Sequence, residues 1–188
     1  VVLVMHHVHD AQFAVHFPPW LARIGRWLEG PAARRVYRRA VTVAVSNSTV
    51  RAMRERLGWR GKIVVVPNGM VHPPEFEPAR SVRPSLVCLG RLVAHKRVDR
   101  LIEIVGGMRE DWPGLRLHVI GTGPEEEALR AAAEPLGDSV VVHGFVDDMR
   151  PLVAGATVYV CPIRDGGGTK LKVLDALAMG KPLIAHPI

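Results

Sequence analysis

The sequence predicts an α/β protein built from parallel sheets with helices on both faces. Short apolar runs rich in β-branched residues alternate with stretches whose apolar residues recur at spacings of three and four. One such stretch places Val98, Leu101, Ile102 and Val105 on a single helical face. This alternation predicts parallel sheets, because a strand that runs beside its predecessor in the same direction needs a crossover helix between the two.

Strands are expected wherever an apolar run is bounded by polar, glycine or proline residues. These runs span residues 1–5, 41–45, 63–66, 85–89, 115–120, 140–143, 157–161 and 183–185. Between the third and fourth strands, residues 71–84 contain four prolines and show no periodicity, which is typical of a linker. We therefore expect residues 1–72 to be the end of one domain, 73–82 a linker, and 83–188 most of a second domain. Because the chain starts inside an apolar run, we also expect a fragment.

The helices that follow two of these strands are expected to begin with unusual charges. The N-terminus of a helix carries partial positive charge and favours acidic residues. Two expected helices break this rule: one begins with Lys96 and Arg97 and the other with Lys170 and Lys172. A third expected helix, which also follows a strand and a glycine turn, obeys the rule with Glu125, Glu126 and Glu127. Cations at a positive helix end repel one another unless an anion lies between them, so we predict a phosphate-binding cleft formed by these two helix starts.

Glycines near the same strand ends support a ligand site. Parallel sheets bind ligands at the carboxyl ends of their strands. The positions just past those ends include Gly90, Arg91, Gly121, Gly123, Asp165 and Gly166. Gly167, Gly168 and Thr169 precede the last helix, where consecutive N–H groups can hold an anion and Thr169 is the expected N-cap.

Asp175 has two interpretations that its spacing does not separate. It lies three residues after Lys172, so the two side chains can pair on the helix surface. It is also placed one turn above the predicted phosphate site, where its carboxylate can accept hydrogen bonds from sugar hydroxyls.

Two better-known kinds of phosphate-binding motif are excluded by the sequence. Glu126 replaces the third glycine of a dinucleotide fingerprint, and no G-x4-G-K-[ST] run is present.

Net charge separates the two halves of the chain. Residues 1–80 contain 12 lysines and arginines against 5 acidic residues, which accounts for the whole net charge of +7. Much of it lies at residues 20–39 beside two tryptophans, which fits a solvated helix pair or a helix resting on an anionic membrane. No nucleic-acid motif accompanies it. The HHVHD run at the first strand end leaves three interpretations open. Core or loop histidines are the commonest, a strand-end histidine that faces the cleft is the catalytic alternative, and a metal held by His7 and His9, which share one face of the strand, is the weakest.

Hydropathy and cysteine placement narrow the class of protein further. No apolar run approaches the roughly 20 residues of a membrane span. Cys88 and Cys161 both lie within expected strands, where thiols are usually small core residues, and this favours a reducing compartment such as the cytoplasm.

From Ser46 onward the chain resembles the retaining glycosyltransferases of family 4, which have the GT-B fold. The motifs that carry the resemblance occur in the family's order: VSNSTVRAMRERLG, KIVVVPNGM, LVCLGRLVAHKRVDRLIE, LHVIGTGPEEEALR, VVHGFV and GGGTKLKVLDALAMGKPLIA. The resemblance implies two Rossmann-like domains and the transfer of a sugar from a nucleoside-diphosphate donor, of the UDP or GDP type, to an acceptor hydroxyl with retention. It implies no metal or other cofactor.

The resemblance also assigns roles to residues. Arg91 and Lys96 match the family's diphosphate-binding pair, and Asp175 matches the second acid of its Glu-x7-Glu pattern. Gly167 stands where the first acid would be, so backbone N–H groups of the glycines are expected to replace that contact, and Lys172 is expected to add a further contact to phosphate. Phe145 and Val146, after Gly144, match the turn beside the nucleobase. His6 or His7 matches the histidine that faces the acceptor.

The expected acceptor is a glycan or a lipid-linked sugar, reached from the cytoplasm with peripheral contact at the inner face of the membrane. Three alternatives remain. Two are enzymes of the same fold, a nucleotide-sugar epimerase and a glycan phosphorylase. The third is a non-catalytic basic module that binds membranes or nucleic acid through residues 20–39.

Overall fold

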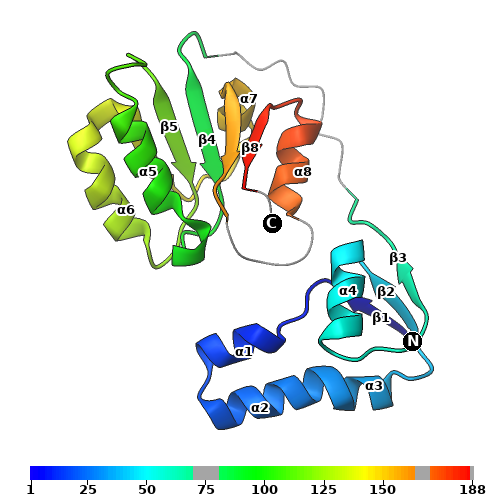
Figure 1. Cartoon of the computed structure of the whole chain (residues 1–188). Coiled ribbons are helices and arrows are strands. Elements are labelled where there is room, and N and C mark those ends of the chain that lie inside the picture. The colour runs from blue at the N-terminus through cyan, green and yellow to red at the C-terminus, as the bar shows by residue number, and fades with distance from the viewer. Residues whose placement is uncertain (70–80, 164–169, 187–188) are drawn as a thin grey trace. The chain divides into compact units, whose positions relative to one another are not determined.

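The computed structural model describes residues 1–69, 81–163 and 170–186. Contacts divide these residues into two compact units, one spanning Val1–Gly69 and the other holding the described residues from Ser81 onward (Figure 1). Each unit contains a fully parallel sheet that packs against helices, which confirms the predicted fold class. Most of the predicted linker, residues 73–82, lies outside the described residues, so its limits stay a prediction.

The first unit is a three-stranded sheet in the order β1-β2-β3. In chain order its elements are β1 (Val2–Met5), α1 (Asp10–His16), α2 (Pro19–Trp27), a π-helical turn (Leu28–Ala32), α3 (Ala33–Val36), β2 (Val41–Ala44), α4 (Asn47–Glu55) and β3 (Ile63–Val65). The α4 helix starts after Ser46, whose Oγ accepts a hydrogen bond from the N–H of Thr49 at 3.1 Å. The hydrophobic core of this first unit includes Met53 and Trp59.

The arginine-rich segment forms consecutive helical turns from α2 to α3. The π-helical turn between them contains Pro31, which has no N–H to donate and so interrupts the α-helical hydrogen-bond pattern. Trp20 and Trp27 are 65% and 57% exposed on α2. In the described part of the chain, none of the helices is both long enough and apolar enough to cross a membrane.

The second unit is a five-stranded sheet in the order β6-β5-β4-β7-β8. Its elements are β4 (Ser85–Leu89), a 3-10 turn (Ala94–Lys96), α5 (Val98–Gly107), β5 (Arg116–Ile120), α6 (Glu126–Ala133), a 3-10 stretch (Glu134–Ser139), β6 (Val140–Gly144), α7 (Arg150–Gly155), β7 (Val158–Cys161), α8 (Leu171–Ala178) and β8 (Leu183–Ala185). The strands of both units fall within a residue or two of those expected from sequence.

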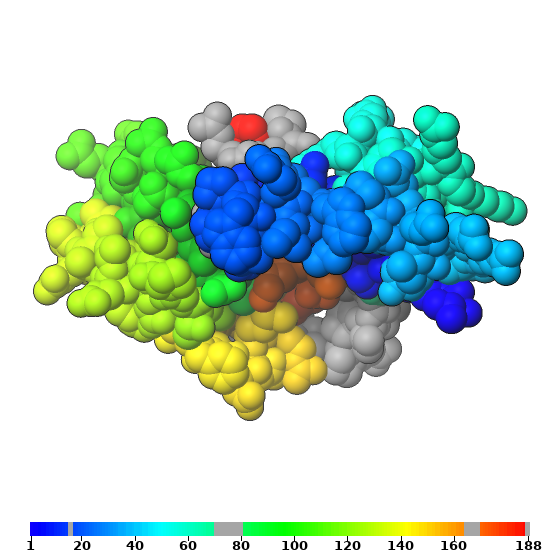
Figure 2. Space-filling model, turned by 90° about the horizontal axis from the view of Figure 1, so that it is seen from below, coloured from blue at the N-terminus to red at the C-terminus, as the bar shows by residue number. Residues whose placement is uncertain are grey.

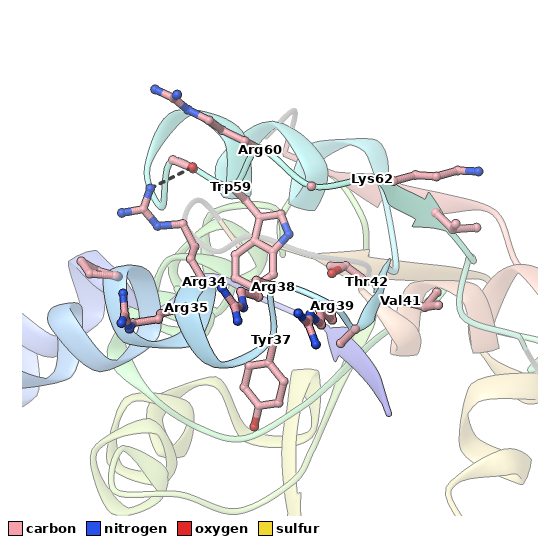
Figure 3. Close-up of a pocket in the computed structure, with 15 residues that line it drawn as sticks. Arg34, Arg35, Tyr37, Arg38, Arg39, Val41, Thr42, Trp59, Arg60 and Lys62 are labelled. Carbon is pink, nitrogen blue, oxygen red and sulfur yellow. Dashed lines mark hydrogen bonds between the residues drawn. The ribbon is translucent and has the colours of Figure 1, made fainter.

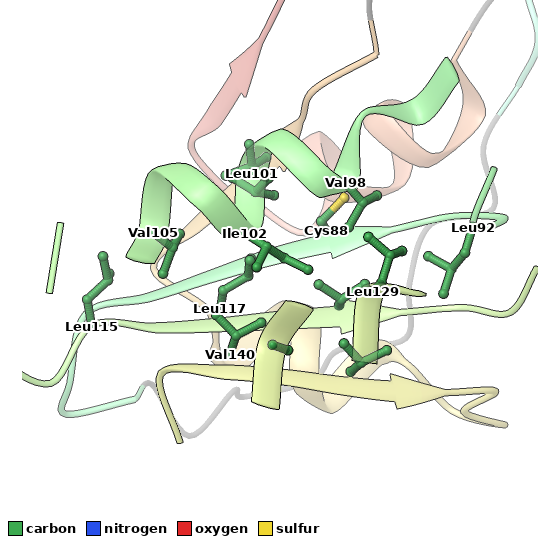
Figure 4. Close-up of a cluster of buried hydrophobic side chains, with 14 residues drawn as sticks. Cys88, Leu92, Val98, Leu101, Ile102, Val105, Leu115, Leu117, Leu129 and Val140 are labelled. Atoms are coloured by element: carbon green, nitrogen blue, oxygen red, sulfur yellow. The ribbon is translucent and has the colours of Figure 1, made fainter. Parts of the chain in front are cut away.

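Helices cover both faces of this second sheet. On one face, apolar side chains of α5 and α6 pack over β4, β5 and β6, and the periodic residues Val98, Leu101, Ile102 and Val105 all belong to this cluster (Figure 4). On the other face, Val153 of α7 and Ala176 of α8 pack over β4, β5 and β7. Cys88 and Cys161 are buried free thiols, as predicted.

Candidate functional site

The strand order of the second unit places a ligand crevice between β4 and β7. From β4 the chain proceeds to β5 and β6 on one side of the sheet, and then crosses to β7 and β8 on the other. Neighbouring connections therefore diverge at the carboxyl ends of β4 and β7, the switch point where doubly wound sheets bind ligands. A recess of about 10 Å³ lies there, lined by Gly90, Arg91 and Lys96 from one side and by Pro162 and Ile163 from the other. The recess has about the volume of one water molecule, so it does not itself enclose a larger ligand.

Lys96 reaches this recess from a 3-10 turn, not from the first turn of α5. The turn ends at Arg97, whose φ of 54° and ψ of 36° put it in the left-handed region, and α5 begins after it with Asp99 in its first turn. The expectation that this helix starts with Lys96 and Arg97 was therefore wrong. Arg97 breaks the helical path between the turn and the helix, and its Nε donates to Asp99 Oδ1 at 3.4 Å.

The α8 helix does begin with positive charge. Lys170 is its N-cap, Lys172 lies in its first turn, and that turn contains no acidic residue. The predicted N-cap, Thr169, was therefore wrong. Thr169 itself lies outside the described residues, as do Gly167 and Gly168. The helix ends at Ala178, and the expected terminal glycine, Gly180, follows the C-cap with a φ of 65°.

Lys96 in the 3-10 turn and Lys170 at the start of α8 are the cations that flank this edge of the sheet. Lys170 is partly buried, and this burial lowers the pKa of its ammonium group, with the charge of Lys96 as the next cause. Lys96 lines the recess together with the exposed Arg91.

Gly121 and Gly123 hold the Arg91 loop through the backbone. A Cβ on Gly121 would lie 1.9 Å from the carbonyl oxygen of Gly90, and one on Gly123 would lie 2.1 Å from that of Leu92. The close approach lets Gly90 N–H donate to the Ile120 carbonyl at 3.0 Å and Leu92 N–H donate to the Thr122 carbonyl at 2.8 Å. These two glycines thus fix the loop that carries Arg91. By contrast, a Cβ on Gly90 would meet no atom within 4 Å.

Phe145 and Val146 follow β6 at the same edge of the sheet. Phe145 is 79% exposed, whereas Val146 packs against the apolar cluster beneath α7 and α8. Gly121 N–H donates to the carbonyl of Gly144 at 2.8 Å, which joins this turn to the loop that supports Arg91. The exposed ring of Phe145 is thus available to a ligand, while Val146 anchors the turn.

Asp175 and Lys172 do not pair. No ion pair joins them among the residues described, although both lie on α8. Asp175 is partly buried and close enough to β7 to be one of the charges that raise the pKa of Tyr159, after burial and the two thiols. Burial is also the main reason that the pKa of Cys88 rises to about 12. Asp175 is thus a partly buried carboxylate of α8 that forms no ion pair with Lys172.

In the first unit, His6 and His7 directly follow β1. They line a cavity of about 330 Å³ together with His9 and Glu29. The rings of His7 and His9 meet edge to face with centroids 4.9 Å apart, so these two histidines lie together as expected. His9 contacts Glu29 Oε1 through its backbone N–H at 2.8 Å and through Nδ1 at 3.1 Å. Glu29 was not predicted, since its nearest sequence neighbours gave no sign of a contact twenty residues away.

The second oxygen of Glu29 is buried without a hydrogen-bond partner among the described residues. Within those residues, no group of three or more His, Cys, Asp or Glu side chains is arranged to hold a metal ion.

Comparisons with known proteins point to one family. Residues 83–188 match the family model described as glycosyl transferases group 1. The chain is 33% identical over 150 residues to an exopolysaccharide phosphotransferase of Streptomyces coelicolor, covering 78% of this chain and 16% of the relative. It is 31% identical over 186 residues to a GDP-mannose-dependent alpha-(1-6)-phosphatidylinositol monomannoside mannosyltransferase of Mycobacterium tuberculosis, covering 85% and 48%. The chain thus spans less than half the length of these relatives.

Solved structures share the fold. WaaG, a glycosyltransferase involved in lipopolysaccharide biosynthesis, superimposes with a TM-score of 0.75 at 17% identity, covering 98% of this chain and 55% of that one. The pneumococcal O-GlcNAc transferase GtfA, solved with UDP and GlcNAc, gives a TM-score of 0.70 at 21% identity, covering 79% and 30%. These likenesses confirm the predicted GT-B-type class of fold.

Proposed function

The chain belongs to the glycosyl transferases group 1 family, and we propose that it transfers a sugar from a nucleoside-diphosphate sugar to an acceptor hydroxyl with retention at the anomeric carbon. The observation that carries the proposal is the position of Arg91 and Lys96 at the switch point of the second sheet, where both line the same recess. A diphosphate bound there would accept hydrogen bonds from both cations.

The chemical role of this site is to stabilise the leaving group. As the glycosidic bond breaks, negative charge grows on the diphosphate while the sugar becomes oxocarbenium-like. Arg91 offers a planar fork to phosphate oxygens, Lys96 and Lys172 add mobile charges, and the N-terminus of α8 adds its dipole. We propose that these groups stabilise the diphosphate without a metal or other cofactor.

Donor and acceptor would contact different parts of the chain. Exposed Phe145 is suited to stack on the base and Asp175 to bind hydroxyl groups of the donor. UDP occupies the similar transferase GtfA and GDP-mannose serves the mycobacterial relative, so we propose a UDP- or GDP-linked sugar. His6 and His7, in their cavity after β1, would face the acceptor, for which the relatives suggest a glycan or a lipid-linked sugar.

The α2 helix is suited to rest on an anionic membrane. Its exposed Trp20, Ile24 and Trp27 alternate with Arg23 and Arg26 at the surface, and the helix belongs to the blue segment in Figure 2. We propose peripheral contact of this helix with the cytoplasmic face of a membrane, which would bring the enzyme to a lipid-linked acceptor.

The decisive experiment compares Arg91→Ala and Lys96→Ala with Arg109→Ala, which removes an exposed cation outside the site. Loss of one electrostatic partner of a developing charge typically costs about 10²–10³ in rate. We expect losses of this size in the first two variants, with unchanged melting temperatures, and nearly normal transfer in the third. Near-normal turnover in both site variants would refute the assignment.

The type of transfer is read from the same reaction. A donor labelled with ³²P in its β-phosphate should leave the label on the released nucleoside diphosphate, and NMR of the product should show the donor's anomeric configuration. Label in the product would instead indicate transfer of a sugar phosphate, and an inverted anomer would exclude retention.

A further inference from the structure

A large positively charged cavity lies in the first unit, away from the carboxyl ends of its strands. It has a volume of about 860 Å³, within the range of small-molecule sites. Its walls come from α3 and the turn after it, the first residues of β2, and the loop that enters β3 (Figure 3). The cavity therefore opens at the amino ends of β2 and β3, whereas His6 and His7 follow the carboxyl end of β1.

The lining of this cavity carries charge of one sign. Of the described residues that form it, six are cationic and none is acidic: Arg34, Arg35, Arg38, Arg39, Arg60 and Lys62. None of the six makes an ion pair with a described residue. The sequence between Glu29 and Glu55 contains no acidic residue that could neutralise them. Their mutual repulsion favours binding of an anion.

Hydrogen bonds fix the walls before any ligand binds. Arg34 Nη1 donates to the Gly58 carbonyl at 3.0 Å, and Arg54 Nη1 donates to the Trp59 carbonyl at 2.6 Å. These two bonds attach the loop before β3 to α3 on one side and to α4 on the other. Trp59 itself is buried in the core, with 4% of its surface exposed. The remaining arginines thus project from a preformed frame, which reduces the ordering cost of binding.

We propose that this cavity is a second anion site, which binds a ligand carrying two or more phosphate groups. Guanidinium groups match phosphate oxygens in a bidentate fashion, and Arg38 and Arg39 are exposed for such contacts beside the hydroxyl-bearing Tyr37. The phosphates have two sources, a soluble phosphorylated compound or the headgroups of an anionic bilayer. The site is independent of sugar transfer, since none of its residues belongs to the predicted donor or acceptor contacts.

The test uses two probes and needs neither donor nor acceptor. Pyrophosphate binding is measured by isothermal titration calorimetry, and binding to phosphatidylglycerol vesicles is measured by co-sedimentation, with phosphatidylcholine vesicles as the neutral reference. The Arg38→Ala/Arg39→Ala variant removes two exposed cavity cations, so its fold should persist. The control, Arg51→Ala/Arg109→Ala, removes the same charge from exposed positions outside the cavity.

We expect the cavity variant to bind at least one probe about 10-fold to 100-fold more weakly, the effect of losing hydrogen bonds to charged groups. The control should stay within about twofold of the native protein by the same reasoning on distant exposed charges. Loss of pyrophosphate binding identifies a soluble ligand, and loss of vesicle binding alone identifies headgroups. Equal loss in the cavity variant and the control, or no binding of either probe by the native protein, would overturn the proposal.

Discussion

Replacing Gly123 by alanine should destabilise the second unit because its backbone touches that of a neighbouring loop. The added Cβ would lie 2.1 Å from the Leu92 carbonyl oxygen and 2.7 Å from both the Leu92 carbonyl carbon and nitrogen. A carbonyl group cannot rotate away as a side chain does. The two loops must therefore separate by roughly 1 Å or more to restore ordinary contact distances.

That separation has a cost that the structure allows us to estimate. It disrupts the hydrogen bond from Leu92 N–H to the Thr122 carbonyl, at 2.8 Å, and that from Glu125 N–H to the Leu92 carbonyl, at 3.1 Å. Two hydrogen bonds at about 0.5–1.5 kcal/mol each, with about 1–3 kcal/mol for overpacking, give a loss of about 2–6 kcal/mol. This is a large part of the roughly 5–15 kcal/mol that stabilises a typical domain.

Urea denaturation of Gly123→Ala beside Gly107→Ala checks the reasoning. Gly107 ends α5, is exposed, and has no atom within 4 Å of the position of an added Cβ. Its replacement should leave the free energy of unfolding unchanged or raise it by up to about 1 kcal/mol, because alanine favours the helix. An unfolding midpoint for Gly123→Ala equal to that of the native protein would show that the loops are not held in this way.

Two further predictions concern polar groups that are buried or half-buried. Lys181, which is 8% exposed, donates through Nζ to the carbonyls of Ala154 and Ala156 at the end of α7, so Lys181→Met should lower the free energy of unfolding by about 1–3 kcal/mol in urea titrations, and an unchanged midpoint would contradict this role. His118 Nδ1 and His143 Nε2 lie 2.9 Å apart, and burial first, then nearby positive charge, lowers the pKa of each ring below its ordinary value of 6.5. The unfolded chain then takes up protons at a higher pH than the folded one. Stability should be complete above pH 6.5 and fall as the pH drops below it, and His118→Gln/His143→Gln should reduce this slope. An equal slope in that variant would assign the pH dependence to other groups.

The sequence predicted the sheets well because the signals for strands are local. Apolar runs such as residues 85–89 are buried on both faces of the sheet, so neither their length nor their composition is ambiguous. The predicted start of α5 was wrong because of the backbone conformation of one residue. Arg97 adopts a left-handed conformation, which a side chain other than glycine seldom does, and it moves the helix start past both cations.

The candidate site was predictable only in part. The places of Arg91, Lys96 and Lys172 after strands predicted a shared site, and in the structure Arg91 and Lys96 line one recess at the switch point. The frame of the arginine cavity depends on contacts such as Arg34 with Gly58, which are 24 residues apart and follow no periodic pattern. Similarly, Gly121 and Gly123 were expected to be glycine so that a ligand could approach. In the structure, the carbonyl groups of Gly90 and Leu92 leave no room for a side chain at these two positions.

The position of β7 beside β4 has a consequence for folding of the second unit. Tyr159 on β7 donates its hydroxyl to the Leu89 carbonyl on β4 at 3.4 Å, across seventy residues of chain. Because β4, β5 and β6 precede β7 and α8 in the chain, Arg91 and Lys96 are synthesised before the lysines of α8. Under the function proposed above, a nucleoside diphosphate that binds the complete site would stabilise the docked state of the last strands.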